Sequence, residues 1–164
     1  MNANAFRHFY EYHFTENHKI WDSYIASLPY EKFLQDVGYS HGSVREQIVH
    51  LISVDEVWFS ELQGIKPSEP LLSANFDDRE NIRTHWDNIE KKMRNYLAEL
   101  QDDSLFEKAI KEPAEDKDLI VWQVLLHVVN HGTDHRAQLL KFLNDLGVKT
   151  ESQDYIFYVY DHLQ

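Results

Sequence analysis

The chain has 164 residues, of which 43% are hydrophobic and 13% aromatic, and this is enough for one well-filled core but too little for two comfortable domains. Acidic residues outnumber basic ones by 28 to 16, and the net charge of -12 opposes nucleic acid, whose phosphates attract clustered Lys and Arg. Cysteine is absent, which excludes disulfides, thiolate metal sites and a cysteine nucleophile. We therefore expect a single domain over residues 1–164, in which any metal is bound by nitrogen and oxygen.

The sequence also lacks the features of a membrane or secreted protein. No apolar run approaches the length that spans a bilayer, and the N-terminus does not combine a basic stretch, an apolar core and a small-residue cleavage site. The absence of cysteine agrees with a reducing compartment. We therefore expect a cytoplasmic protein with no membrane partner and no nucleic-acid partner.

The first half of the chain contains two stretches with the apolar periodicity of helices. One runs over about residues 6–25 and is closed by Pro29. The other follows a capping-box signature, in which Ser43 precedes Glu46 by three residues, and it runs over about residues 44–63. Both stretches are long enough to be principal helices of a bundle.

The second half of the chain adds two more helices. The third follows the acidic segment "NFDD" and has a narrow apolar seam of the kind that antiparallel bundles use, made of Ile82, Trp86, Ile89, Met93, Tyr96 and Leu100. Residues 102–117 carry mixed signals, and we expect them to be irregular. The fourth helix covers about residues 118–146 before Gly147, and the tail "DYIFYVYD" predicts a short helix or an aromatic strand. The prediction is an all-α four-helix bundle with a short extra C-terminal element.

The fourth stretch carries three histidines at a constant spacing of four residues, at positions 127, 131 and 135. His131 and His135 lie in its apolar seam, together with Val124, Val128, Leu139, Phe142 and Leu146. Side chains four residues apart stack on one helix face, so these two rings can converge on one ion. His127 drifts from the seam, and three histidines in a row would span roughly 12 Å, too far for one ion. We assign His127 a structural or outer role and expect a third ligand from another helix.

His50 on the second helix is the candidate third ligand. It shares an apolar stripe with Val54 and Val57 and therefore faces other helices. A lone histidine in such a stripe is more often a core residue hydrogen-bonded to a carbonyl. The pair His131 and His135 favours a metal instead, because core histidines cost packing and leave ring nitrogens to satisfy. The sequence therefore predicts that His131 and His135 bind a metal, with His50 as the candidate third ligand.

The other histidines and some aromatic residues have weaker signals. Surface positions are expected for His8, His18, His41, His85 and His162. His13 lies near the apolar face of the first helix and is a pocket candidate with Trp58 and Trp122, although an aromatic residue at helical spacing is more often simply core. The spacing of His131 and His135 is also that of zinc metalloproteases, but their motif needs Glu where this chain has Gly132, which disfavours peptide hydrolysis by that mechanism.

Two segments carry a family resemblance. "NHGTDHRAQLLKFLNDLG", together with the earlier "GSVREQIVHLISVDEVWFSELQG", resembles the DinB/YfiT-like family of four-helix metalloproteins. The resemblance covers most of the chain, including the "DYIFY" tail and the residues Glu56 and Trp58 after the upstream histidine. It implies that a divalent metal is bound at the positions of His50, His131 and His135.

The chain departs from the family pattern beside the expected ligands. Where the family often has H-H-R-G-Q, this chain has Asp134 before His135 and Ala137 in place of the glycine, and neither change removes a ligand. Three neutral imidazoles keep the full charge of a divalent ion and usually leave an open position, which is a catalytic arrangement. An ion with an open position lowers the pKa of a bound water to about 7 and deprotonates a bound thiol. Imidazole ligands suit zinc, nickel, copper and iron, so the spacing alone does not choose among them. We expect zinc or nickel, with iron or manganese as alternatives.

The resemblance implies metal-dependent transferases and isomerases that use small cellular thiols, and hydrolases. The leading hypothesis is therefore an enzyme that activates a thiol or water for attack on a small-molecule electrophile, with a low-molecular-weight thiol as co-substrate. Asp134, Asn130, Gln138 and Glu56 are candidates for orienting a ligand or handling a proton, although each taken singly is more often solvated helix surface.

Two other hypotheses stay open. In one, a fully coordinated ion stabilises a non-catalytic bundle that serves as a binding or stress-response protein, and a fourth imidazole or a carboxylate ligand would favour it. In the other, a carboxylate replaces the third histidine, as in non-haem iron oxygenases. The resemblance also favours a homodimer over a monomer.

Overall fold

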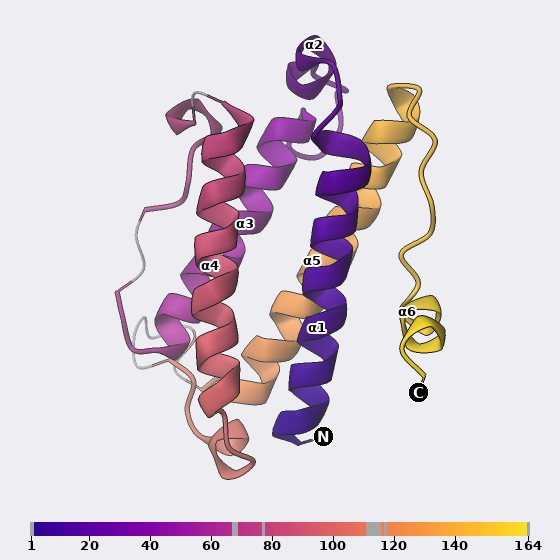
Figure 1. Ribbon diagram of the computed structural model, residues 1–164. Helices are drawn as coiled ribbons and strands as arrows, with labels where there is room; N and C mark the ends of the chain where they lie inside the picture. The colour runs from indigo at the N-terminus through magenta and orange to yellow at the C-terminus, as the bar shows by residue number, and fades with distance from the viewer. Residues whose placement is uncertain (1, 67–68, 77, 111–115, 117, 164) are drawn as a thin grey trace.

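The computed structural model describes residues 2–66, 69–76, 78–110, 116 and 118–163, and four long helices form its body (Figure 1). These helices are α1 (Ala3–Ile20), α3 (Val44–Leu62), α4 (Arg79–Glu99) and α5 (Val121–Asp145). In Figure 1, α1 and α5 run in one direction and α3 and α4 in the other. Helix α3 contacts α4 and α5, and α1 contacts the same two helices, so the four enclose one core. The predicted all-α bundle is confirmed.

In the described part of the chain, five shorter elements connect or flank these helices. They are a π-helical turn η1 (Trp21–Ile25), helix α2 (Tyr30–Leu34), the 3-10 turns η2 (Ser73–Asn75) and η3 (Asp103–Phe106), and helix α6 (Tyr155–Asp161). The turn η1 continues α1, so the first helical stretch ends where the sequence predicts it to end. The sequence analysis did not predict α2, which begins directly after Pro29.

Side-chain caps set the starts of three helices. The backbone N–H of Glu46 donates to the Ser43 hydroxyl at 3.2 Å, so the predicted start of α3 is confirmed. Asp78, at the end of the acidic segment before α4, caps that helix in the same way, whereas Asp77 lies outside the described residues. Helix α1 begins earlier than predicted, at Ala3, because the side chain of Asn2 caps it.

The segment expected to be irregular is described only in part. Residues 103–106 form η3, and Lys108 pairs with Ile120 in an isolated β-bridge just before α5. Residues 111–115 and 117 lie outside the described part of the chain. Helix α5 begins at Val121, three residues later than the predicted start at 118.

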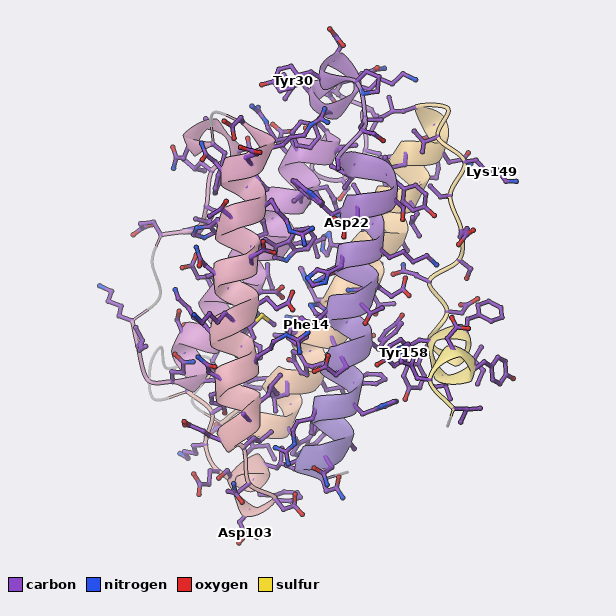
Figure 2. The ribbon with its side chains drawn as sticks, in the orientation of Figure 1. Phe14, Asp22, Tyr30, Asp103, Lys149 and Tyr158 are labelled. Atoms are coloured by element: carbon purple, nitrogen blue, oxygen red, sulfur yellow. The ribbon has the colours of Figure 1, made fainter. Side chains whose placement is uncertain are left out.

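The C-terminal tail forms a helix rather than a strand, and it lies against the outside of α1 (Figure 1). Tyr155 and Tyr158 of α6 pack on Tyr12, with ring centres 5.2 and 5.6 Å away. Figure 2 shows Tyr158 pointing toward α1. The tail therefore covers one side of the bundle. It does not cover the edges of α3 and α5 on the opposite side.

Apolar side chains from all four long helices fill the interior. Figure 2 shows Phe14 directed from α1 into the space beside α4, where the guanidinium of Arg94 lies 4.3 Å from its ring centre. The seam predicted for α4 is largely buried, with Tyr96 half-buried and Leu100 just beyond the end of the helix. Among the described residues, no helix combines the length and the apolar character that crossing a membrane requires.

Candidate metal centre

Three histidines predicted as ligands meet between α3 and α5. Nε2 of His50 on α3 lies 3.3 Å from Nε2 of His131 on α5. The ring centre of His135 lies 4.1 Å from that of His131 and 4.7 Å from that of His50. Because α3 and α5 run antiparallel, the second turn of α3 faces the middle of α5, and this packing brings the three rings together.

Among the described residues, the histidines whose nitrogens all lie within 4.8 Å of one another are His41, His50 and His135, and the predicted ligand His131 is not in this group. His131 approaches the group at His50. Two imidazole nitrogens at about 2.1 Å from a tetrahedral ion lie roughly 3.4 Å apart, close to the separation between His50 and His131. All three predicted ligands are half-buried, so the cluster lies at the edge of the bundle within reach of solvent.

The electrostatics of the cluster keep its imidazoles neutral. Burial and the neighbouring imidazoles lower the pKa of His50 to about 4 and that of His131 to about 3. Burial, with His41 nearby, also lowers the pKa of His135, against the opposing effect of Asp134. Neutral imidazole is the form that binds a metal, so the site holds its donors ready at neutral pH.

The sequence analysis placed His41 on the surface, and the structure brings this exposed residue into the cluster. Its ring stacks on that of His50, with centres 3.8 Å apart and planes inclined by 22°, and its centre lies 5.5 Å from that of His135. His41 lies in the loop just before α3, where helical periodicity says nothing about the direction of a side chain. The one available signal was its position two residues before Ser43, the cap of the helix that carries His50.

Gln47 is a second residue that the sequence analysis missed. Its side chain is fully buried, and its amide lies 2.6 Å from Nδ1 of His135. An amide can turn either its nitrogen or its oxygen toward this atom. In the structure the amide nitrogen faces His135, because it also donates to the carbonyl of His135 at 3.3 Å while the amide oxygen accepts from Ser40. Accepting from Nδ1–H, the outer contact that orients metal-binding histidines, would need the amide to turn over when Nε2 binds an ion. Gln47 lies one turn before His50, so α3 carries both a predicted ligand and a contact to the predicted ligand His135 on α5.

His13, a pocket candidate from the sequence, lies in the core behind the cluster. Its ring is fully buried against Gly132 of α5, where an added Cβ would lie 2.5 Å from Cε1 of His13. Arg136 donates to Nδ1 of His13 at 3.1 Å, which places the ring proton on Nε2, 3.5 Å from the buried carboxylate of Asp55. Burial lowers the pKa of His13 despite Asp55, so the ring is neutral.

Arg136 extends this buried network around the ligand helix. Its guanidinium is fully buried and also donates to Asn17 of α1, to Thr133 and to Gln153 in the tail. The network therefore ties α5 to α1, α3 and the segment before α6 at the residue that directly follows His135. It fixes the position of the helix that carries two of the expected ligands.

The polar residues proposed to orient ligands lie around the cluster rather than in it. Asp134 and Gln138 are hydrogen-bonded to each other on the outer side of α5 at 3.0 Å. Glu56 lies 3.1 Å from Nε2 of His85 and 3.8 Å from Nζ of Lys92, so its described partners are on α4. Of these residues, Asp134 acts electrostatically on a predicted ligand, His135.

The remaining candidates have other surroundings. Asn130 lines a groove between α5, α1 and the tail, together with Tyr12 and Gln153. Trp58 contacts exposed His127, with ring centres 5.1 Å apart. Trp122 is half-buried and packs against the core.

The other histidines expected on the surface differ in exposure. His8 and His162 are exposed, whereas His18 and His85 are half-buried beside carboxylates. The pairing with Glu90 raises the pKa of His18. These four residues lie outside the cluster of His41, His50, His131 and His135.

Comparison with known proteins agrees with this architecture. The sequence model of the DinB family matches residues 1–162. The chain is also similar to Protein DinB of Bacillus subtilis (strain 168), with 25% identity over 167 aligned positions that cover 98% of this chain and 96% of the relative. The match extends over the whole bundle, including α3 and α5 with their histidines and the C-terminal helix. The chain therefore belongs to the DinB family.

Proposed function

We propose that this protein is a divalent-metal-dependent enzyme of the thiol S-transferase or hydrolase type. His50, His131 and His135 hold the ion, zinc or nickel in preference to iron or manganese. A low-molecular-weight thiol or water is the nucleophile, and a small-molecule electrophile is the second substrate. The cluster of neutral imidazoles between α3 and α5 is the observation that carries this proposal.

The composition of the cluster favours catalysis. All its nitrogen donors are neutral, and a divalent ion held by neutral ligands alone lowers the pKa of a bound water or thiol. The cluster is half-buried at the edge of the bundle, so a small molecule can approach it without opening the core. Gln47 orients His135, and the buried network of Arg136 and His13 holds α5 in register with α1 and α3.

A second candidate function is a metal-stabilised bundle without catalytic activity, which serves as a binding or stress-response protein. His41 favours it, because a fourth imidazole beside His50 can complete a four-coordinate site. The two functions share the same ligand set and differ in whether a position on the ion is available to a small molecule. They are separated by whether the loaded protein turns over a thiol and an electrophile.

The test is metal content after purification without an immobilised-nickel column. We expect about one divalent ion per chain in the native protein, and loss of that ion in both His50→Ala and His131→Ala. His162→Ala is the control, because this exposed histidine on the tail should leave the metal content unchanged. Absence of metal in the native protein, or retention in His50→Ala, would remove the chemical basis of the proposal.

Activity is then measured with the loaded protein, a small thiol such as 2-mercaptoethanol, and an aryl chloride whose substitution changes its absorbance. Metal-dependent turnover that disappears in His131→Ala supports the enzyme, whereas a stably bound ion without turnover of thiol or ester substrates supports the structural role. The homodimer and the cytoplasmic location expected from the sequence stay predictions.

A further inference from the structure

His41 differs from the three predicted ligands in how it is held. The other three project from long helices, whereas His41 comes from the loop before α3 and is exposed. Among the described residues, no group hydrogen-bonds to its ring, and its principal contact is the stack on His50. Aromatic stacking of this kind contributes only about 0.5–1.5 kcal/mol. The imidazole can therefore leave the cluster by rotation of its side chain alone.

The backbone that carries His41 is, in contrast, well anchored. Val37 donates to the carbonyl of Gly42 at 2.7 Å, and Gly42 donates to the carbonyl of Tyr39 at 3.0 Å, which closes the loop. The Ser40 hydroxyl donates to the side chain of Gln47 at 3.2 Å, and that amide contacts Nδ1 of His135. The loop thus stays over the cluster whether or not the imidazole of His41 faces it.

Resting on the proposed function, we propose that His41 is a displaceable fourth ligand, which occupies the open coordination position in the resting state and gives way to the substrate thiol or water. His41, His50 and His135 each offer a nitrogen within 4.8 Å of the others, so all three can reach one ion once rotation of the His41 side chain takes its ring out of the stack on His50. His131 is not in that group, but its Nε2 lies 3.3 Å from Nε2 of His50, and in this proposal it is the fourth imidazole. Four imidazole ligands match the coordination number of a closed zinc site, and removing one gives the open three-ligand arrangement.

This arrangement has a chemical consequence for the nucleophile. An incoming thiolate must displace the imidazole of His41, which leaves the ion without any hydrogen bond of the loop being broken. A loosely bound ligand of this kind keeps the ion saturated when no thiol is present. It also lowers the affinity for a thiol, because the free energy gained when a thiolate binds is reduced by the free energy lost when His41 leaves the ion.

The test uses Co²⁺-loaded protein, whose visible absorption reports coordination number, in native, His41→Ala, His50→Ala and His127→Ala forms. We expect His41→Ala to retain about one ion per chain and to bind it at least roughly tenfold more weakly, the scale on which even an outer partner of a ligand acts. Its spectrum should change, and added imidazole should restore the native spectrum. It should also bind 2-mercaptoethanol more tightly than the native protein does.

His127→Ala is the matched control, because His127 is an equally exposed histidine on the other side of His131, with ring centres 5.7 Å apart. It should keep the native spectrum, cobalt affinity and thiol affinity. Native-like cobalt affinity and spectrum in His41→Ala, with loss of the ion in His50→Ala, would overturn the role of His41 while leaving the three-histidine site intact. Failure of the native protein to bind cobalt would overturn both the role of His41 and the proposed function.

Discussion

Replacement of Gly132 by alanine tests whether the buried network sets the close approach of α1 and α5. The ring of His13 occupies the space in which a side chain at this position would lie. An added Cβ would be 2.5 Å from Cε1 and 2.8 Å from Nδ1 of His13, and 3.0 Å from Nη1 of Arg136. Both neighbours are fully buried, so neither can move into solvent. The alanine must therefore push α5 away from α1 or force the His13 ring off its contact with Arg136.

Three effects determine the expected change in the free energy of unfolding. Overpacking of a close-packed interior costs about 1–3 kcal/mol. Loss of the bond from Arg136 to His13, which leaves buried polar groups unpaired, costs about 1–3 kcal/mol more. The higher helix propensity of alanine offsets about 1 kcal/mol of this destabilisation. We expect Gly132→Ala to destabilise the metal-free protein by about 2–4 kcal/mol.

The assay is urea denaturation of the metal-free protein, in a double-mutant cycle of Gly132→Ala with His13→Ala. In His13→Ala, the imidazole that the added methyl group would contact is absent. Gly132→Ala should therefore reduce the free energy of unfolding by about 2 kcal/mol less in this background than in the native protein. Ala137→Gly is the control at an exposed position of the same helix, and it should cost only about 1 kcal/mol through propensity. A neutral Gly132→Ala, or the same cost in both backgrounds, would refute the steric argument.

Three further perturbations address the support of the site, pH dependence and the tail. Gln47→Leu removes the partner of Nδ1 of His135 and should weaken Zn²⁺ binding roughly 10- to 100-fold in chelator competition. His18 lies 2.6 Å from Glu90, and its raised pKa means that the pair stabilises the fold fully below the unfolded value of 6.5 and loses this contribution as the pH rises through the folded pKa. The stability difference between native protein and His18→Gln should therefore shrink as the pH rises above 6.5 in urea titrations. Gln153→Ala removes the side-chain bonds that fix the tail and should speed hydrogen exchange of the α6 amides, while α1 keeps its protection.

Each of these perturbations has a matched control. Gln63→Leu, at the exposed end of α3, should leave zinc affinity unchanged, and equal weakening by both variants would contradict the role of Gln47. His8→Gln, on the exposed side of α1, should show the same dependence of stability on pH as the native protein. If the stability difference between the native protein and His18→Gln did not change with pH, linkage to Glu90 would be ruled out. Lys149→Ala, at an exposed position of the segment between α5 and α6, should leave the exchange of α6 as it is in the native protein. Unchanged exchange in Gln153→Ala would show that the aromatic contacts suffice to hold the tail.

The sequence by itself predicted the four long helices and three of the histidines that lie together between α3 and α5. Apolar spacing identified all four long helices, because the side that a residue presents on a helix follows from its position in the chain. The same local rule placed His131 and His135 on one face, and it placed His50 on a face directed at other helices. Capping chemistry located the start of α3 at Ser43, because a cap acts on backbone groups only two or three residues away.

Only the tertiary structure brought His41 and Gln47 to the cluster. A loop has no periodicity, so the direction of His41 depends on how residues 37–42 close over the packed helices. Buried polar side chains select their partners only after the helices have packed, which is why nothing in the local pattern paired Gln47 with His135 or His13 with Arg136. Local spacing thus fixed which helix faces carry imidazoles, and non-local packing decided which of the imidazoles meet.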